Sequence, residues 1–196
     1  MGRHREACSL EHRGRIGFAG GLLAAFAMNL FARAVSSAGC GREAPGAAPG
    51  QDRVGRGVQP PQADGTADDD ATVRVGMVAY RALTGSAPRR ATRSWLGTAV
   101  HYAFGGTVGA CYAIMAKRLP IIRAGHGTAY AAAVWIVADE AIMPLLNLSR
   151  GPRQLPAGVH LYALAGHWAY GLTLESVIRY TIPYPNDSHI ERRTAS

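Results

Sequence analysis

The chain has 196 residues, of which only 17% are charged, and a mean hydropathy near zero conceals long apolar runs between polar segments. Runs of this length exclude the alternating strands of a membrane barrel and predict helices, because backbone groups in a bilayer must bond within the segment. The formal charge of +8 comes mostly from arginines at run ends and in loops, where they meet phospholipid headgroups, which argues against nucleic-acid binding.

The first apolar run, Ile16 to Ala32, follows a basic N-terminal segment at 1–15. It predicts a transmembrane helix over 16–37, because Arg33 can extend the run by reaching the interface. A cleaved signal peptide is the alternative, and Ser37 to Cys40 resembles a lipoprotein cleavage box. Arg33, between the run and that cysteine, favours a retained helix.

A segment rich in Gly, Pro, Ala and Gln follows, and it predicts a disordered linker over 38–67. An interfacial helix is predicted over 68–85, with Asp70 as a suitable N-cap. Arg74 and Arg81 make this helix too charged to span a membrane, and it is also too short. We therefore expect it to lie along the membrane surface.

Three further spans are predicted over 95–118, 125–147 and 158–180, and a polar tail over 181–196 ends the chain. Four spans place both termini on one side of the membrane. Lys and Arg near the termini favour the cytoplasm for both, although the long first loop also carries eight arginines. The sequence thus predicts an all-α membrane protein, a four-helix bundle with one amphipathic surface helix.

Glycines recur at a spacing of four in two of these spans. Gly17 and Gly21 form one pair, and Gly105 and Gly109 form another. Each pair gives a small-residue face at which helix backbones approach closely, within the bundle or between protomers. The alternative is that glycine is simply common in membrane helices.

Two adjacent carboxylates, Asp139 and Glu140, stand inside the third apolar run. A carboxylate in a bilayer costs several kcal/mol unless it is paired, hydrated or protonated. Successive residues lie about 100° apart on a helix, so one carboxyl is expected to face the bundle and the other water or an arginine. Pro144 removes an N–H four residues after Glu140 and kinks the helix, as an ion or proton site would need. The alternative is a solvated pair at the exit of a short helix.

The fourth run carries His160, His167 and Glu175 at helical spacing along one stripe, and His101 lies early in the second run. Imidazoles titrate near neutral pH, so this stripe could relay protons to the two acids. The alternatives place His160 and Glu175 at opposite interfaces and bond His167 to a backbone carbonyl.

No cofactor is predicted, although histidines on different helices of a bundle leave haem or a metal as a minor alternative. The three cysteines lack a CxxC pair, which makes a disulfide framework or a zinc site unlikely on spacing grounds. Soluble catalytic signatures such as GxSxG, HExxH and phosphate loops are absent from the sequence. The chain is therefore not predicted to be an enzyme.

Three motifs stand out in these runs: HYxFG from His101, W-x-x-x-D/E-x-x-x-P from Trp135 to Pro144, and GHxxYG from Gly166. They resemble those of the YagU-like bacterial inner-membrane proteins, a group with a domain of unknown function. The resemblance covers roughly 15–29 and 71–179. It implies a multi-pass protein of the inner (plasma) membrane, with no established activity and no catalytic residues to carry over.

These observations lead to two expectations about function. The first is a proton- or pH-linked role in transport or envelope stress, with Asp139 and Glu140 as acceptors and His160 and His167 as relays. The second is a non-catalytic scaffold or assembly subunit held by its glycine faces. The expected partners are the lipid bilayer and a second copy or another membrane protein.

Overall fold

A computed structural model describes residues 2–37, 71–149 and 152–182, and these are helical throughout, apart from short connections. The all-helical class predicted from the apolar runs is confirmed for this part of the chain. The predicted linker, the N-cap at Asp70 and nearly all of the polar tail lie outside the described residues. The elements are α1 (Gly2–Ser37), α2 (Ala71–Thr84), α3 (Arg90–Met115), η1 (Pro120–Arg123), α4 (Thr128–Trp135), η2 (Ile136–Ile142), α5 (Met143–Leu145), η3 (Pro152–Gln154) and α6 (Ala157–Thr181).

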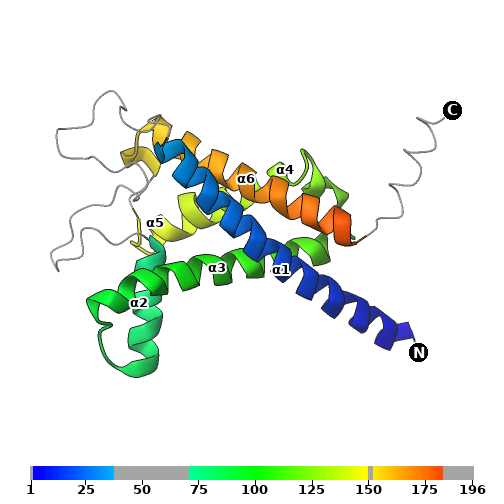
Figure 1. The fold of residues 1–196 in the computed structure, drawn as a ribbon, viewed down its shortest axis with the longest axis horizontal. Coiled ribbons are helices and arrows are strands. Elements are labelled where there is room, and N and C mark those ends of the chain that lie inside the picture. The colour runs from blue at the N-terminus through cyan, green and yellow to red at the C-terminus, as the bar shows by residue number, and fades with distance from the viewer. Residues whose placement is uncertain (1, 38–70, 150–151, 183–196) are drawn as a thin grey trace.

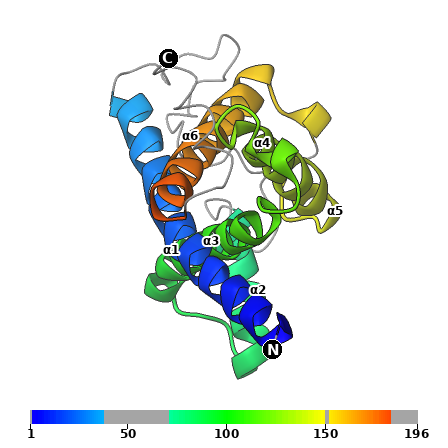
Figure 2. The ribbon, with the colours of Figure 1, turned by 90° about the vertical axis from the view of Figure 1, so that its right-hand side faces the viewer.

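Four long helical segments, here called passes, alternate in sense, and α1 runs obliquely to α3 (Figure 1). They are α1, α3, the continuous α4–η2–α5 unit, and α6. α1 packs on α3 and α6, and α4 packs on α6. The end view shows these passes grouped around a common centre (Figure 2).

The helix α2 lies across the direction of α3 rather than along it (Figure 1). It packs on the first half of α3, where Gly76 and Gly97 permit the contact. A Cβ on Gly76 would meet Leu96, and one on Gly97 would meet Val73 at 2.5 Å. Gly85, with φ of +68°, directly follows its last turn, as glycine does at many helix ends.

Two helices begin earlier in the chain than the membrane spans predicted from the sequence. α1 starts at Gly2, so the basic segment at 1–15 continues the helix instead of preceding it. No proline interrupts this stretch, and a helix that is already nucleated extends at little cost. α3 starts at Arg90, just after Pro88, five residues before the predicted span.

The centre of the bundle is made largely of small residues and tyrosines. The buried core residues include Ala24, Ala25, Ala113 and Tyr112 on α1 and α3, with Leu174 on α6. Small side chains let helices approach to backbone contact, which is how helices associate where water supplies no driving force.

Large apolar side chains cover the outside of all four passes. By length and composition, two stretches among the described residues are able to cross a membrane, Leu10–Ser37 and Thr128–Leu145, and both are mostly unburied. The exposed apolar residues include Phe18, Leu23, Phe26 and Leu30 on α1, Trp95 on α3, Ile136, Val137 and Leu145 on the third pass, and Leu161, Trp168 and Leu172 on α6.

Candidate functional site

A cavity of about 450 Å³ lies among the helices, with walls from α1, α2, α3, the third pass and α6. Five of the six ionisable candidates from the sequence line it: His101, Asp139, Glu140, His160 and His167. The rest of the wall is mainly apolar, including Ala25, Met28, Val75, Val100, Phe104, Val108, Val134, Val159 and Ala163.

The two acids stand in a widened helical turn. Residues Ile136–Ile142 form a π-helix, and the N–H of Met143 bonds to the carbonyl of Ala138, five residues back. Pro144 follows at once and has no N–H to continue an α-helical ladder. A π turn is rare and often marks a functional position, and it rotates less per residue than an α turn. As a result Asp139 and Glu140 both line the cavity, whereas an α-helix was expected to separate them.

Glu140 makes the shorter of the two acid–histidine contacts. Its Oε1 lies 2.6 Å from Nδ1 of His160, and Nε2 of the same ring lies 3.0 Å from the carbonyl oxygen of Pro152. A carbonyl only accepts, so Nε2 carries a hydrogen and donates it to Pro152. The Nδ1–Glu140 contact then needs a second proton, held either as imidazolium and carboxylate or as imidazole and carboxylic acid. The pair therefore stores one exchangeable proton.

Asp139 and His167 form a looser pair one step along the same wall. Nδ1 of His167 donates to the carbonyl of Ala163 at 2.9 Å, which leaves Nε2 facing Asp139 Oδ2 at 3.7 Å. In the neutral ring with this tautomer Nε2 is an acceptor, so two acceptors face each other unless one of them gains a proton. The Asp139 side chain is 45% exposed. This carboxylate is the accessible one.

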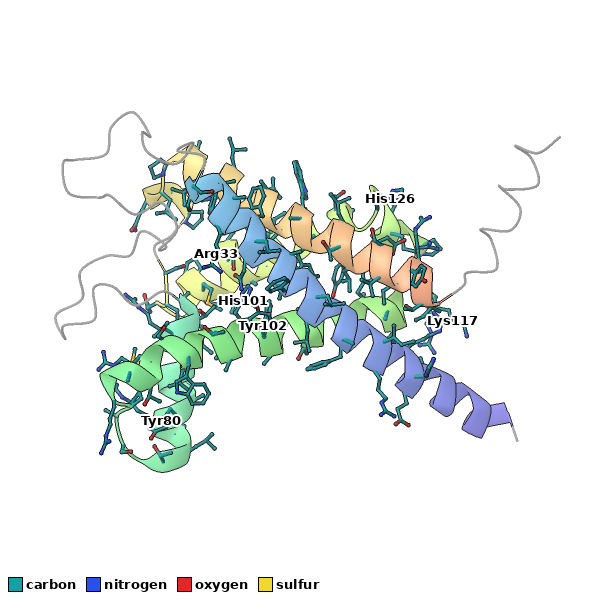
Figure 3. The ribbon with its side chains drawn as sticks, viewed as in Figure 1. Arg33, Tyr80, His101, Tyr102, Lys117 and His126 are labelled. Carbon is teal, nitrogen blue, oxygen red and sulfur yellow. The ribbon has the colours of Figure 1, made fainter. Side chains whose placement is uncertain are left out.

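His101 and Trp135 complete the polar lining. His101 faces α1, with Nε2 at 3.5 Å from the carbonyl of Ala25, and it stands beside Tyr102 between α1 and α3 (Figure 3). Trp135 lies one helical turn before Asp139, with its ring centroid 6.4 Å from that of His160. Its indole N–H is shielded from solvent and has no hydrogen-bond partner among the residues that the structure describes.

The electrostatic balance of the cavity is acidic. None of the described residues that line it is a lysine or an arginine. Because Glu140 and His160 share one proton, that pair is neutral, and an ionised Asp139 beside a neutral His167 gives the cavity one negative charge. A proton taken up by Asp139 or His167 balances this charge. Proton uptake therefore changes the charge of the whole cavity.

Glu175 lies apart from the cavity and has a different role. It is fully buried, and Oε1 accepts from Nε of Arg123 at 2.9 Å and from Nε of Arg179 at 2.7 Å. Its Oε2 accepts from the hydroxyl of Tyr112 at 2.5 Å. The network ties α6 to α3 and to the turn after α3, at the end of the bundle where Lys117 and His126 also lie (Figure 3). We assign Glu175 to holding these elements together.

The predicted glycine faces meet each other inside the chain. A Cβ on Gly21 would overlap the carbonyl of Gly105, and one on Gly17 would overlap that of Gly109. The two small-residue faces thus form the α1–α3 contact, which resolves the choice between bundle and protomer packing for these four residues. Gly127 and Gly171, which the sequence analysis did not single out, make the matching contact between the third pass and α6.

Two observations bear on the alternative of haem or metal binding by the histidines. Both ring nitrogens of His160 are engaged, one with Glu140 and one with Pro152. Among the described residues no three or more His, Cys, Asp or Glu side chains are grouped to hold a metal ion.

Sequence reasoning missed several residues that complete these clusters. Arg179 is four residues after Glu175, a spacing that places charges together on one helix face and could have been read from the sequence. Arg123 and Tyr112 reach Glu175 only through the tertiary fold, and so does the Pro152 carbonyl that bonds His160. No local sequence pattern links these residues to the side chains that they contact.

Fold and site together define an all-helical protein with an apolar outer surface and a cavity lined by carboxylate–imidazole pairs. The chain belongs to the family described as protein of unknown function (DUF1440), whose model matches residues 79–176. The matched stretch contains all five ionisable cavity residues and Glu175, while α1 lies outside it. No curated protein and no solved structure matches the chain.

Proposed function

We propose that the chain is a multi-pass membrane protein whose cavity exchanges protons at the Asp139–His167 and Glu140–His160 pairs, in a proton-linked transport role. The observation that carries the proposal is the Glu140–His160 contact at 2.6 Å, with the far nitrogen of the ring bonded to Pro152. That arrangement holds one proton beyond the fixed Nε2 hydrogen, within an apolar bundle. Ionisable groups within apolar helices are costly, and they usually mark functional sites.

Four membrane spans are part of this proposal. The support is that large apolar side chains are exposed on every pass. Together they make a far larger apolar surface than the single patch that a soluble protein usually exposes. The alternating passes and the crosswise α2 also suit a bundle along the membrane normal with one helix at the interface (Figure 1).

We propose the plasma membrane as the location, with both termini in the cytoplasm. Figure 3 shows Lys117 at the end of the bundle where α1 begins and α6 ends. The basic residues in the first half of α1, in the turn after α3 and at the end of α6 include Arg13, Arg15, Lys117, Arg118, Arg123 and Arg179. An excess of Lys and Arg beside short loops favours the cytoplasmic side. The motifs HYxFG, W-x-x-x-D/E-x-x-x-P and GHxxYG further support a YagU-like inner-membrane protein within the family.

The test is proton flux into sealed liposomes that carry the purified full-length protein and an internal pH-sensitive dye. Wild type is compared with Asp139→Asn and Glu140→Gln, and Glu11→Gln is the matched control because Glu11 and its ion-pair partner Arg15 are both exposed. We expect a flux that rises as the outside pH falls, and a loss of at least about tenfold in Asp139→Asn.

Orientation of the inserted protein and folding of each variant are checked by protease accessibility and size-exclusion chromatography. A wild-type flux equal to that of empty liposomes refutes proton exchange across the membrane. Equal fluxes in wild type and both acidic variants refute the assignment of the exchange to this cavity.

A further inference from the structure

We infer that the cavity binds an apolar organic cation, whose charge takes the place of the proton at Asp139. The inference rests on the proposed function, since it names the class of molecule that the proton-exchanging site carries. Three observations carry it: the size of the cavity, the chemistry of its walls, and the open contact at Asp139.

The volume is larger than proton transfer requires. A proton relay needs only a file of hydrogen-bonded groups or waters, whereas about 450 Å³ falls within the range of small-molecule pockets. Much of the wall is Val, Ala, Met and Phe, which gives ordered water few partners. A molecule with an apolar body fills such a space better than water does.

The charge of the wall selects the sign of the ligand. Asp139 and Glu140 are the acidic groups among the lining residues that the structure describes, and no lysine or arginine offsets them. Glu140 is closed off by His160 at 2.6 Å, but Asp139 faces His167 only at 3.7 Å and is 45% exposed. An anionic ligand would meet repulsion at Asp139, while a cation gains an ion pair with it.

Aromatic groups near the acids add to the preference for a cation. Trp135 lies one turn from Asp139 on the same helix, and Phe104 stands in the wall formed by α3. Aromatic faces attract organic cations, and tryptophan does so most strongly. The unpartnered indole N–H of Trp135 remains as a donor for a ligand that also carries an acceptor.

Proton and cation compete in this arrangement. The titratable groups that line the cavity are His101 on α3, Asp139 and Glu140 on η2, and His160, His167 and Tyr170 on α6, while the lining residues of α1 and α2 are not titratable. A protonated Asp139, or an imidazolium at His167, lowers the negative charge available to a ligand. We therefore expect cation binding to weaken as the pH falls.

The experiment measures binding of radiolabelled tetraphenylphosphonium to the full-length protein in nanodiscs at pH 5.5 and 7.5, with empty nanodiscs subtracted. We expect saturable binding that is at least about tenfold weaker in Asp139→Asn, while Glu11→Gln binds like wild type. Tetraphenylborate, an anion of the same shape, should bind no more than it does to empty nanodiscs.

Equal binding by wild type and a folded Asp139→Asn, equal binding of the anion, or an absence of saturable binding each overturns the inference. Stronger binding at pH 5.5 than at 7.5 overturns it as well. Proton flux lost in the acidic variants without saturable tetraphenylphosphonium binding would leave the proposed function standing and reject the cation alone. Saturable, pH-sensitive binding without any proton flux would instead reject the transport role.

Discussion

Replacing Glu175 with glutamine should strongly destabilise the bundle, because this carboxylate is fully buried and accepts three hydrogen bonds. Two of the donors are guanidinium groups, of which Arg123 is 14% exposed and Arg179 is 39% exposed. The amide keeps the shape of the side chain but removes the charge that balances Arg123. It also directs an NH₂ group toward a donor on at least one side.

The expected loss follows from the burial of the partners. Hydrogen bonds to charged groups contribute about 1.5–3 kcal/mol each, but the three share one carboxylate and do not add. Breaking a buried pair by removing one partner costs about 3–5 kcal/mol. Because Arg179 can turn to solvent and Arg123 cannot do so as easily, we expect about 3 kcal/mol. For a protein of this size that corresponds to a fall in melting temperature of roughly 6–12 °C.

The assay is thermal unfolding in detergent, followed by the loss of the monodisperse peak in size-exclusion chromatography. Tyr112→Phe is the graded comparison, since it removes only the donor to Oε2 and should cost about 1–2 kcal/mol. Glu11→Gln, on the exposed surface of α1, should leave the melting temperature unchanged. A loss below about 1 kcal/mol in Glu175→Gln would refute the structural role assigned to this residue.

Two further substitutions test the packing and the π turn. Gly21→Ala should lower the stability of the folded protein by about 2 kcal/mol, because the new Cβ would overlap the carbonyl of Gly105. Gly14→Ala is the control: its Cβ would lie 3.6 Å from Ile114 Cδ1, so it should be neutral or slightly stabilising in the same melting assay. Pro144→Ala restores the missing N–H, so the wide turn should tighten toward an α-helix. We expect this variant to have higher thermal stability, with proton flux and tetraphenylphosphonium binding both reduced. Unchanged flux and binding would contradict the role given to the π turn.

The helical class was predictable because long apolar runs without strand alternation permit little else. The start of α1 was not, since charged residues at 1–15 argue for an end to the membrane segment but not for an end to the helix. Helix and membrane boundaries are separate properties. Hydropathy indicates where a membrane segment ends, whereas the absence of proline and the continuity of the backbone hydrogen bonds decide where a helix ends.

The ionisable residues of the cavity were predictable as a set, because charged and imidazole groups inside apolar runs are costly and therefore stand out. Their pairing was not predictable. It depends on the antiparallel packing of the third pass against α6, which brings Glu140 to His160 and Asp139 to His167. Glu175 was grouped with them because it shares a stripe with the histidines, yet two turns of helix carry it to the far end of the bundle.

The π turn explains how two neighbouring residues serve two histidines that lie seven positions apart. Seven residues of α6 correspond to about 10 Å along its axis, far more than the step between Asp139 and Glu140. The carboxylates must therefore diverge along the wall, the longer glutamate toward His160 and the shorter aspartate toward His167. The shorter aspartate places its Oδ2 3.7 Å from Nε2 of His167, whereas the longer glutamate places its Oε1 2.6 Å from Nδ1 of His160.

Because of this difference in side-chain length, we expect the two acids to have different roles in proton exchange. The Glu140–His160 pair is complete in itself, with every ring nitrogen satisfied, so exchange there requires that a short hydrogen bond be broken. The Asp139–His167 pair is incomplete, and a proton, a water or a cation improves it at no such cost. Asp139→Asn should consequently impair exchange more than Glu140→Gln does, although the glutamate makes the stronger contact. The reverse order would mean that the closed pair, and not the open one, handles the proton.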